Sequence, residues 1–219
     1  MNGRPGRLIT FEGGEGAGKS TQVRRLVSRL LEHGASVLAT REPGGSPFAE
    51  RLRDILLSGS VARLGPAAEA LLFTAARIDH VETAIAPALA AGRFVLCDRY
   101  IDSTRAYQGG LGDLSSGLVS ALEHVSIGAN KPDLTVLVDV APEIGLARAA
   151  ARRAQAEADR FESRNLAYHT KLRQAFLAIA RAEPERFLVV DGAEPPDAVA
   201  DRVWRDVSAR FLRPGGGVV

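Results

Sequence analysis

The chain has 219 residues, of which 46% are hydrophobic, and a formal net charge of +2. This length suffices for one domain with a hydrophobic core that needs no disulfide, so we expect residues 1–219 to form a single domain. The small net charge argues against nucleic-acid binding. The single cysteine, Cys97, excludes a disulfide within the chain, and no apolar run is long enough to span a bilayer. We therefore expect a cytoplasmic protein with no nucleic-acid or membrane partner.

Short apolar runs recur along the chain and are separated by segments with helical spacing, which predicts an α/β fold with a five-stranded parallel sheet flanked by helices. The runs are nearly continuous in hydrophobicity, which is typical of strands buried on both faces. Ligands of such sheets bind at the carboxyl ends of the strands. The runs are Leu8–Phe11, Ser36–Ala39, Phe94–Cys97, Leu134–Val140 and Phe187–Val190.

The first run is followed by GGEGAGKS, which matches the phosphate-binding P-loop, Gly-x-x-x-x-Gly-Lys-Ser. Gly13 and Gly18 allow the backbone amides to turn toward an anion, and the following helix adds the positive end of its dipole. Lys19 is expected to reach the β- and γ-phosphates, and Ser20 to ligate Mg²⁺. The alternative is a glycine-rich turn with a capping serine. The residues expected to bind ATP are Gly13, Gly14, Glu15, Gly16, Ala17, Gly18, Lys19, Ser20 and Thr21.

The segment 66–89 predicts a long helix that Pro87 kinks or breaks near its end. At 100° per residue, one stripe is expected to form the core face: Leu71, Ala75, Ile78, Glu82, Ile85 and Leu89. Phe73 and Arg77 then lie together on the opposite side, as suits a flat ligand that stacks and accepts a hydrogen bond. Packing of Phe73 under a neighbouring helix or at a subunit interface is the alternative.

The third run is followed by DRYIDSTRAYQGG. Asp98 stands at a strand end, where it can hold Mg²⁺ or position a phosphoryl acceptor. Arg99 can bind a phosphate in a bidentate manner. The alternative is that Asp98 only forms a structural ion pair with a nearby arginine. Tyr107 and Gln108 offer a ring and an amide for a sugar or a base.

Residues 130–133 read NKPD, which matches the guanine-reading motif of GTP-binding switches. That motif follows a strand, whereas NKPD precedes the run that begins at Leu134. We therefore interpret it as the turn that starts a strand.

Four blocks with their order and spacing resemble the thymidylate kinase family: TREPGG (40–45), LLFTAAR (71–77), DRYIDST (98–104) and AYQGG (106–110). The resemblance covers residues 8–211. It implies a P-loop NTPase-type three-layer fold with a helical lid, a homodimer, and transfer of the γ-phosphoryl group of ATP to dTMP with Mg²⁺. The terminal segments MNGRPGR and RPGGGVV are themselves expected to be flexible tails. The implied dTMP-binding residues are Glu12, Glu42, Pro43, Arg53, Phe73, Arg77, Asp98, Arg99, Thr104, Tyr107 and Gln108, and the implied metal residues are Ser20 and Asp98.

Some members of this family carry an arginine inside the P-loop, where this chain has Gly14 to Ala17. The resemblance is therefore to the bacterial subgroup whose lid, here residues 147–164, supplies the arginines. A solvated charged helix is the alternative for this segment. Arg153 is the first candidate for the transferring phosphoryl group, followed by Arg148 and Arg152. The expected catalytic residues are these three arginines together with Lys19 and Arg99. The lid segment 147–164 also contains Arg160, Arg164 and the DRFE at 159–162.

Two other functions remain open at this point. A kinase for another nucleoside monophosphate or a deoxynucleoside would keep the fold and the P-loop and change the acceptor site. A nucleotide-dependent binding switch would bind nucleotide tightly and form no phosphorylated product.

Overall fold

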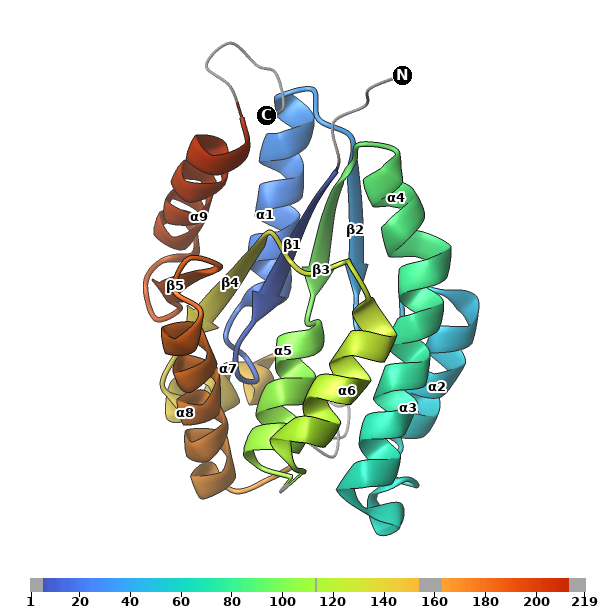
Figure 1. The fold of residues 1–219 in the computed structure, drawn as a ribbon. Coiled ribbons are helices and arrows are strands. Elements are labelled where there is room, and N and C mark those ends of the chain that lie inside the picture. The colour runs from blue at the N-terminus through green and yellow to red at the C-terminus, as the bar shows by residue number, and fades with distance from the viewer. Residues whose placement is uncertain (1–5, 113, 154–162, 213–219) are drawn as a thin grey trace.

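The computed structural model describes residues 6–112, 114–153 and 163–212, and Figure 1 shows their arrangement. A parallel sheet with the strand order β2-β3-β1-β4-β5 forms the centre of the fold. All five predicted strands are confirmed, each with ends within two residues of the prediction. The strands are β1 (Arg7–Glu12), β2 (Val37–Arg41), β3 (Phe94–Asp98), β4 (Leu134–Asp139) and β5 (Phe187–Asp191).

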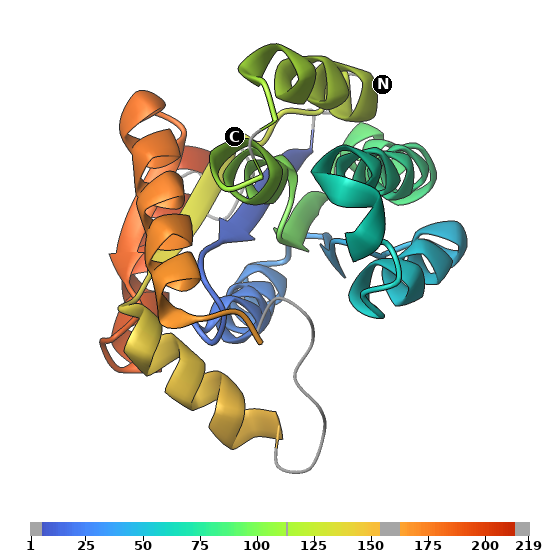
Figure 2. The ribbon, with the colours of Figure 1, turned by 90° about the horizontal axis from the view of Figure 1, so that it is seen from below.

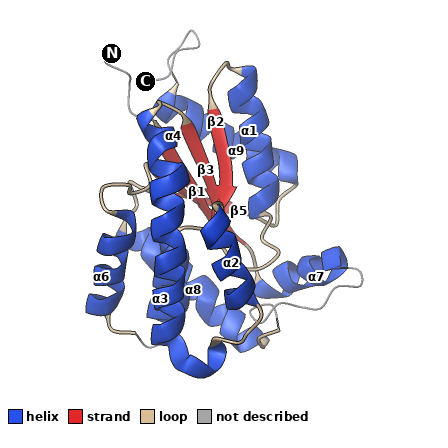
Figure 3. Cartoon of the chain, turned by 90° about the vertical axis from the view of Figure 1, so that its right-hand side faces the viewer, coloured by secondary structure: helices blue, strands red, loops and turns tan. Residues whose placement is uncertain are grey.

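Helices cover both faces of the sheet, with α1 and α9 on one face and α4, α6 and α8 on the other (Figures 1 and 3). None of the helices in the described part of the chain is both long enough and apolar enough to cross a membrane. The helices are α1 (Lys19–Glu32), α2 (Pro47–Leu57), α3 (Gly65–His80), α4 (Ala86–Ala90), α5 (Ile101–Thr104), α6 (Ser116–Ile127), α7 (Pro142–Arg153), α8 (Leu166–Ala182) and α9 (Pro196–Phe211), with a 3₁₀ turn η1 (Ala62–Leu64) and π-helical segments η2 (Val81–Ile85) and η3 (Arg105–Gly110).

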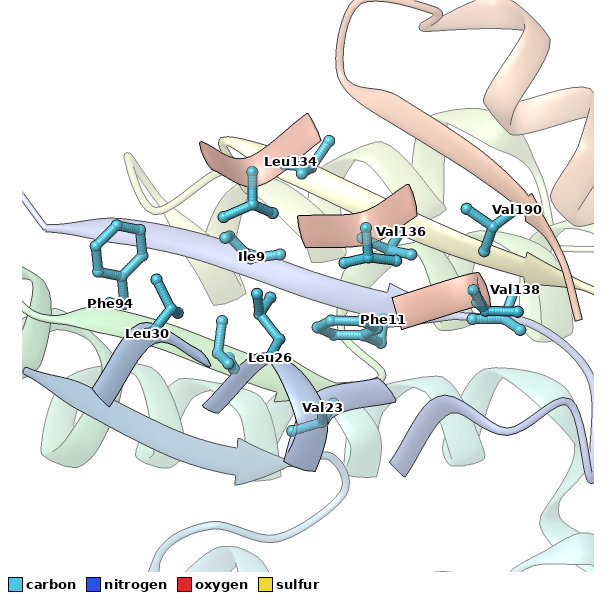
Figure 4. Close-up of a cluster of buried hydrophobic side chains, with 14 of the residues drawn as sticks. Ile9, Phe11, Val23, Leu26, Leu30, Phe94, Leu134, Val136, Val138 and Val190 are labelled. Atoms are coloured by element: carbon cyan, nitrogen blue, oxygen red, sulfur yellow. The ribbon is translucent and has the colours of Figure 1, made fainter. Parts of the chain in front are cut away.

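The main core lies between the sheet and the pair α1 and α9 (Figure 4). Ile9 and Phe11 point from β1 toward Leu26 and Leu30 of α1, and all four side chains are at most 2% exposed. Burial of each such side chain contributes about 2 kcal/mol. The prediction that every strand is buried on both faces is wrong for β2, whose residues are half-buried or exposed, and for part of β5, where Val189 is 38% exposed. β2 and β5 are the two edge strands, so each has a neighbouring strand on one side alone.

Residues 65–90 form the predicted long helix, but the expected core face is wrong at its start. Leu71 is 57% exposed, whereas Arg77 is 2% exposed. This half of the helix packs between α2 and α6, and its apolar face contacts the sheet only further on, where Ile85 lies beside Leu8. The π-helical turn η2 shifts the phase between the two halves, so a constant 100° per residue misplaces the stripe. The chain continues helically through Pro87 to Ala90.

The NKPD turn lies at the amino end of the sheet, away from the P-loop. Asp133 accepts a hydrogen bond from the Leu8 backbone N–H at 2.8 Å and pairs with Arg7 at 3.3 Å. This confirms the interpretation of NKPD as the start of β4.

The P-loop lies at the carboxyl end of β1, between β3 and β4, where the chain order of the strands changes direction. Such a switch point leaves a crevice for a ligand. The start of α7 packs tightly against this loop. A side chain at Gly16 would overlap the Gly145 carbonyl group, and one at Gly145 would overlap the carbonyl oxygen of Glu15. Gly145 therefore sets how closely α7 approaches the P-loop.

Glu12, the last residue of β1, is fully buried and holds the segment that follows β3. Its carboxylate accepts hydrogen bonds from the Tyr100 N–H at 2.8 Å, the Ser103 N–H at 3.1 Å and the Ser103 hydroxyl at 2.7 Å. Burial and, second to it, the nearby carboxylate of Asp102 raise the pKa of Glu12 to about 7.

We expect Gly145→Ala to destabilise the protein by about 1–3 kcal/mol, because the added methyl group must displace the backbone of the P-loop. Gly117→Ala is the matched control, since Gly117 also lies in a helix and its Cβ position is open. Alanine is the better helix former, so the control should lose no stability. Denaturant unfolding of both variants measures this, and equal stabilities would contradict the tight contact.

We expect the stability difference between wild type and Glu12→Gln to depend on pH. The unfolded carboxyl titrates near 4.5 and the folded one near 7, so the wild type loses stability relative to the variant as pH rises from about 4.5 to 7. The loss in free energy of unfolding is at most about 3 kcal/mol, because the size of the pKa shift of Glu12 limits it. Denaturant unfolding of both proteins at pH 5, 6, 7 and 8 tests this. A difference that stays constant across these pH values would show that Glu12 titrates normally.

Candidate active site

A cavity of about 480 Å³ opens at the carboxyl edge of the sheet. It brings together segments that are far apart in the sequence: the P-loop, the ends of β2 and β3, one side of α2 and α3, η3, and the end of α7 (Figure 2). Most of the predicted site residues line it. These are Glu15, Gly16, Ala17, Gly18, Lys19, Ser20, Thr21, Glu42, Pro43, Arg53, Phe73, Arg77, Asp98, Arg99, Thr104, Tyr107, Gln108 and Arg152.

The P-loop has the backbone geometry that its glycines allow. Gly13, Gly16 and Gly18 have φ values of 138°, 64° and 101°, in the range that favours glycine. Lys19 is 8% exposed, and its ammonium donates to the carbonyl oxygens of Gly13 at 3.1 Å and Gly14 at 2.8 Å. Burial, followed by the charge of Arg99, lowers the pKa of Lys19. A bound phosphate would act against both causes, so this lysine is suited to an anionic ligand.

Ser20 and Asp98 both line the cavity, and the Ser20 hydroxyl donates to Asp98 Oδ2 at 2.5 Å. Both are oxygen ligands, the type that Mg²⁺ prefers, and Mg²⁺ commonly completes its coordination with water and phosphate oxygens. Among the described residues, no three His, Cys, Asp or Glu side chains form a cluster that could hold a metal by themselves. The pair therefore fits a Mg²⁺ ion that arrives with a nucleotide.

Glu15 links the P-loop to the acceptor side of the cavity. Its Oε1 accepts from Arg99 Nη2 at 2.6 Å and from the Tyr107 hydroxyl at 2.9 Å. Burial alone would raise the pKa of Glu15, but Arg99 and then Lys19 outweigh it and lower the pKa to about 2. Glu15 is therefore a permanent carboxylate that fixes the guanidinium and the phenol between the two halves of the site.

Arg77 of α3 lines the cavity, is almost completely buried, and is held by two groups. Its Nε donates to Glu42 Oε2 at 2.7 Å and its Nη2 to the Tyr100 carbonyl oxygen at 3.2 Å. His80, one turn further on, is within 3.2 Å of the other oxygen of Glu42. The ion pair with Glu42 keeps the buried Arg77 charged and in a single orientation.

Phe73 is half-buried and lines the cavity beside Arg77. Their common face was predicted from helical spacing, although the core stripe used as its reference was partly wrong. From the neighbouring helix α2, Arg53 also lines the cavity, and its Nη1 donates to the Pro43 carbonyl oxygen at 2.7 Å. An aromatic ring and two guanidinium groups thus converge on one space.

Some predicted site residues lie outside the cavity lining. Glu12 is behind the wall, bound to Tyr100 and Ser103, so it supports the site without facing it. Gly13 and Gly14 contribute to the P-loop turn and accept from Lys19, but do not line the cavity.

The predicted lid arginines divide in three ways. Arg152 lines the cavity from the last turn of α7. Arg148 points elsewhere, because its Nη1 donates to the Gly192 carbonyl oxygen at 2.6 Å, in the loop after β5. Arg153 ends α7, but its side chain is outside the described part of the structure, as are residues 154–162 with Arg160 and the DRFE segment.

Several lining residues were not predicted. Ser103 lies in α5, next to the predicted Thr104, and Arg99 Nη1 donates to its hydroxyl at 3.3 Å. Leu57 lies one turn after Arg53 on α2. The helical i,i+4 spacing from a predicted site residue would have identified Leu57. Arg24, Arg41 and Tyr100 complete the additions.

The cavity is much more positive than the whole protein. Among the described lining residues, seven are cationic (Lys19, Arg24, Arg41, Arg53, Arg77, Arg99 and Arg152) and three are acidic (Glu15, Glu42 and Asp98). An excess of four positive charges in one cleft attracts polyanions and stabilises them when bound. The arrangement therefore suits a ligand pair that carries several phosphate groups.

Comparison with known proteins agrees with this geometry. A family model described as thymidylate kinase matches residues 11–203. The chain is 58% identical over 210 residues to a thymidylate kinase of Rhodopseudomonas palustris strain CGA009, covering 95% of this chain and 91% of the relative. It is 55% identical over 214 residues to a thymidylate kinase of Bradyrhizobium diazoefficiens, covering 98% and 94%.

The crystal structure of thymidylate kinase from Ehrlichia chaffeensis superposes with a TM-score of 0.74 at 31% identity, covering 93% of this chain and 99% of that one. The family match spans the P-loop and the segments whose side chains converge on the cavity. The chain belongs to the thymidylate kinase family.

Proposed function

We propose that the cavity carries out the phosphorylation of dTMP by ATP with its two halves in distinct roles. The P-loop and Lys19 hold the ATP phosphates, and Ser20 with Asp98 holds the accompanying Mg²⁺. The metal neutralises phosphate charge when bound. The single observation that carries the proposal is the contact of Glu15 with Arg99 and Tyr107, because it joins the phosphate loop to the segment after β3, which lines the same cavity as Phe73 and Arg77.

The acceptor half has groups for each part of a deoxynucleoside monophosphate. Phe73 offers a ring for stacking on the base, and Arg77 a donor for the base edge. Arg53 and Arg99 offer guanidinium groups for the phosphate. Further roles are assigned by resemblance to the family. Thr104 and Gln108 contact the base, and Tyr107 crowds the 2′ position of the sugar. Glu42 lies near the sugar or the phosphates, and Pro43 helps to shape the wall of the pocket.

The reaction makes electrostatic demands and few covalent ones. The acceptor is a phosphate with a second pKa near 6, so at neutral pH it is already a nucleophile without a general base. Two polyanions must meet, and charge gathers on the transferred phosphoryl group. Lys19 and Arg99 supply positive charge from the P-loop side of the transferred phosphoryl group. We assign the positive charge on its other side to the lid, residues 147–164.

Within the lid, Arg152 becomes the first candidate because it lines the cavity. Arg153 remains a candidate at the end of the same helix. Arg148 would have to leave the Gly192 carbonyl oxygen to take part, so we place it third.

We also propose a homodimer and a cytoplasmic location. Exposed apolar side chains on neighbouring helices support the dimer: Ile55 of α2 is 46% exposed and Leu71 of α3 is 57% exposed. The buried free thiol of Cys97 is consistent with a reducing compartment.

We expect dTMP to be the fastest acceptor in a panel of dTMP, dUMP, dCMP, dGMP, dAMP and UMP, with ADP formation measured at a fixed ATP and Mg²⁺ concentration. The ring of Phe73 and the side chain of Arg77 suit a pyrimidine with an acceptor at its edge. Equal or faster turnover of a purine monophosphate would support a kinase for another acceptor. Tight ATP binding with no product from any acceptor would support a binding switch.

We expect Arg152→Ala to lower kcat at least about tenfold and to leave the KM for dTMP within about threefold, since a cation used mainly in the transition state affects turnover more than ground-state binding. The matched control is Arg181→Ala, an exposed arginine on α8. It should leave both parameters unchanged. A loss of kcat smaller than threefold for Arg152→Ala would assign the transition-state charge to another residue.

A further inference from the structure

A buried carboxylate stands behind one of the residues that face the base. Gln108, in the π-helical segment η3, lines the cavity and is 3% exposed. Its Nε2 donates to Oε1 of Glu69 on α3 at 2.7 Å. Glu69 is 8% exposed and is not among the described residues that line the cavity. The contact therefore lies behind the cavity wall.

The chemistry of this contact determines the orientation of the Gln108 amide. An amide has a donor end and an acceptor end of nearly the same shape, whereas a carboxylate only accepts. The NH₂ group of Gln108 must therefore point to Glu69, and its carbonyl oxygen must point away from Glu69. The side-chain Oε1 of Gln108 accepts no hydrogen bond from the described residues. This atom is also not completely buried.

The opposite type of group is offered by Arg77. Its Nε and Nη2 are bound to Glu42 and the Tyr100 carbonyl oxygen, but its buried Nη1 has no partner among the described residues. Arg77 and Gln108 both line the cavity, and between them they keep one unbonded donor, the buried Nη1, and one unbonded acceptor, the side-chain Oε1. A carboxylate fixes each of the two, Glu42 behind the first and Glu69 behind the second.

We propose that Glu69 is a specificity-determining positioning residue that makes Gln108 an obligatory hydrogen-bond acceptor toward the base. This inference rests on the proposed function. Thymine and uracil have an acceptor at O4 beside a donor at N3–H, which complements this wall. Cytosine has a donor at N4 beside an acceptor at N3, so it would oppose donor to donor and acceptor to acceptor. Unpaired buried polar groups of this kind are the strongest basis for rejecting an analogue.

The inference depends on the carboxylate character of Glu69 more than on its size. With glutamine at this position, either amide can donate to the other, and Gln108 can turn its NH₂ group toward the base. The variant would then lose discrimination against cytosine while keeping the shape of the wall. A glutamate that only supported the packing of α3 would not have this effect.

The test is Glu69→Gln, with Glu69→Ala made in parallel in case the first variant does not fold. Dissociation constants for dTMP and dCMP are measured by titration, so that a nucleotide that turns over slowly is still compared. We expect the ratio of dCMP to dTMP dissociation constants to fall about tenfold in either variant, while ATP affinity stays unchanged. Glu123→Gln is the matched control, because Glu123 is also buried and bonded, to Arg105, but lies outside this cavity. Its ratio should equal that of the wild type.

The double variant with Gln108→Ala decides how Glu69 acts. If it acts through Gln108, Glu69→Gln changes the ratio in the wild-type background and has no further effect in the Gln108→Ala background. An unchanged ratio in the first background, or an equal fall in both, would overturn the inference. A wild type that binds dTMP no better than dCMP would instead overturn the proposed function, so the two failures are distinguishable.

Discussion

The site depends on the ion pair between Glu15 of the P-loop and Arg99 at the end of β3, with Nη2 and Oε1 2.6 Å apart. Each partner also makes a second contact that extends the link. Glu15 accepts a hydrogen bond from the Tyr107 hydroxyl, and Arg99 donates one to the Gly13 carbonyl oxygen. A phosphate loop alone binds a donor, and an aromatic pocket alone binds an acceptor. The ion pair sets the distance between the two, and a phosphoryl transfer is sensitive to that distance.

The backbone at Arg99 is part of the same constraint. Its φ of 67° lies in the left-handed region, which for a residue other than glycine costs on the order of 1–2 kcal/mol. Such a conformation persists where surrounding contacts determine it. Here Arg99 Nη1 is held by Gly13 and Ser103, while the carboxylate of Glu12 anchors the next residue, Tyr100, through its backbone N–H. Several buried polar groups thus stabilise one strained residue that faces the cavity.

The sequence was sufficient to predict the order and type of the strands, the P-loop and most of the cavity lining, since these depend on local patterns and on the rule that ligands bind at strand ends. Burial of β2 was mispredicted because edge position is a property of the sheet and not of the strand. The stripe through Leu71 failed because η2 interrupts the helical phase. The direction of Arg148 could not be predicted, since its partner, Gly192, is supplied by a loop 44 residues further along the chain. Glu69 was missed because nothing local in α3 indicates that Gln108 lies opposite it.

The absence of an arginine from position 16 of the P-loop has a physical reason in the packing of α7. Gly16 has a φ of 64°, and the Gly145 carbonyl group occupies the space that a side chain at this position would need. An arginine at position 16 would therefore require α7 to move away from the loop. With glycine at both positions the helix lies directly against the P-loop, and its last turn brings Arg152 to the cavity. The contact that excludes a side chain at position 16 is thus the same contact that allows α7 to supply a cation from outside the loop.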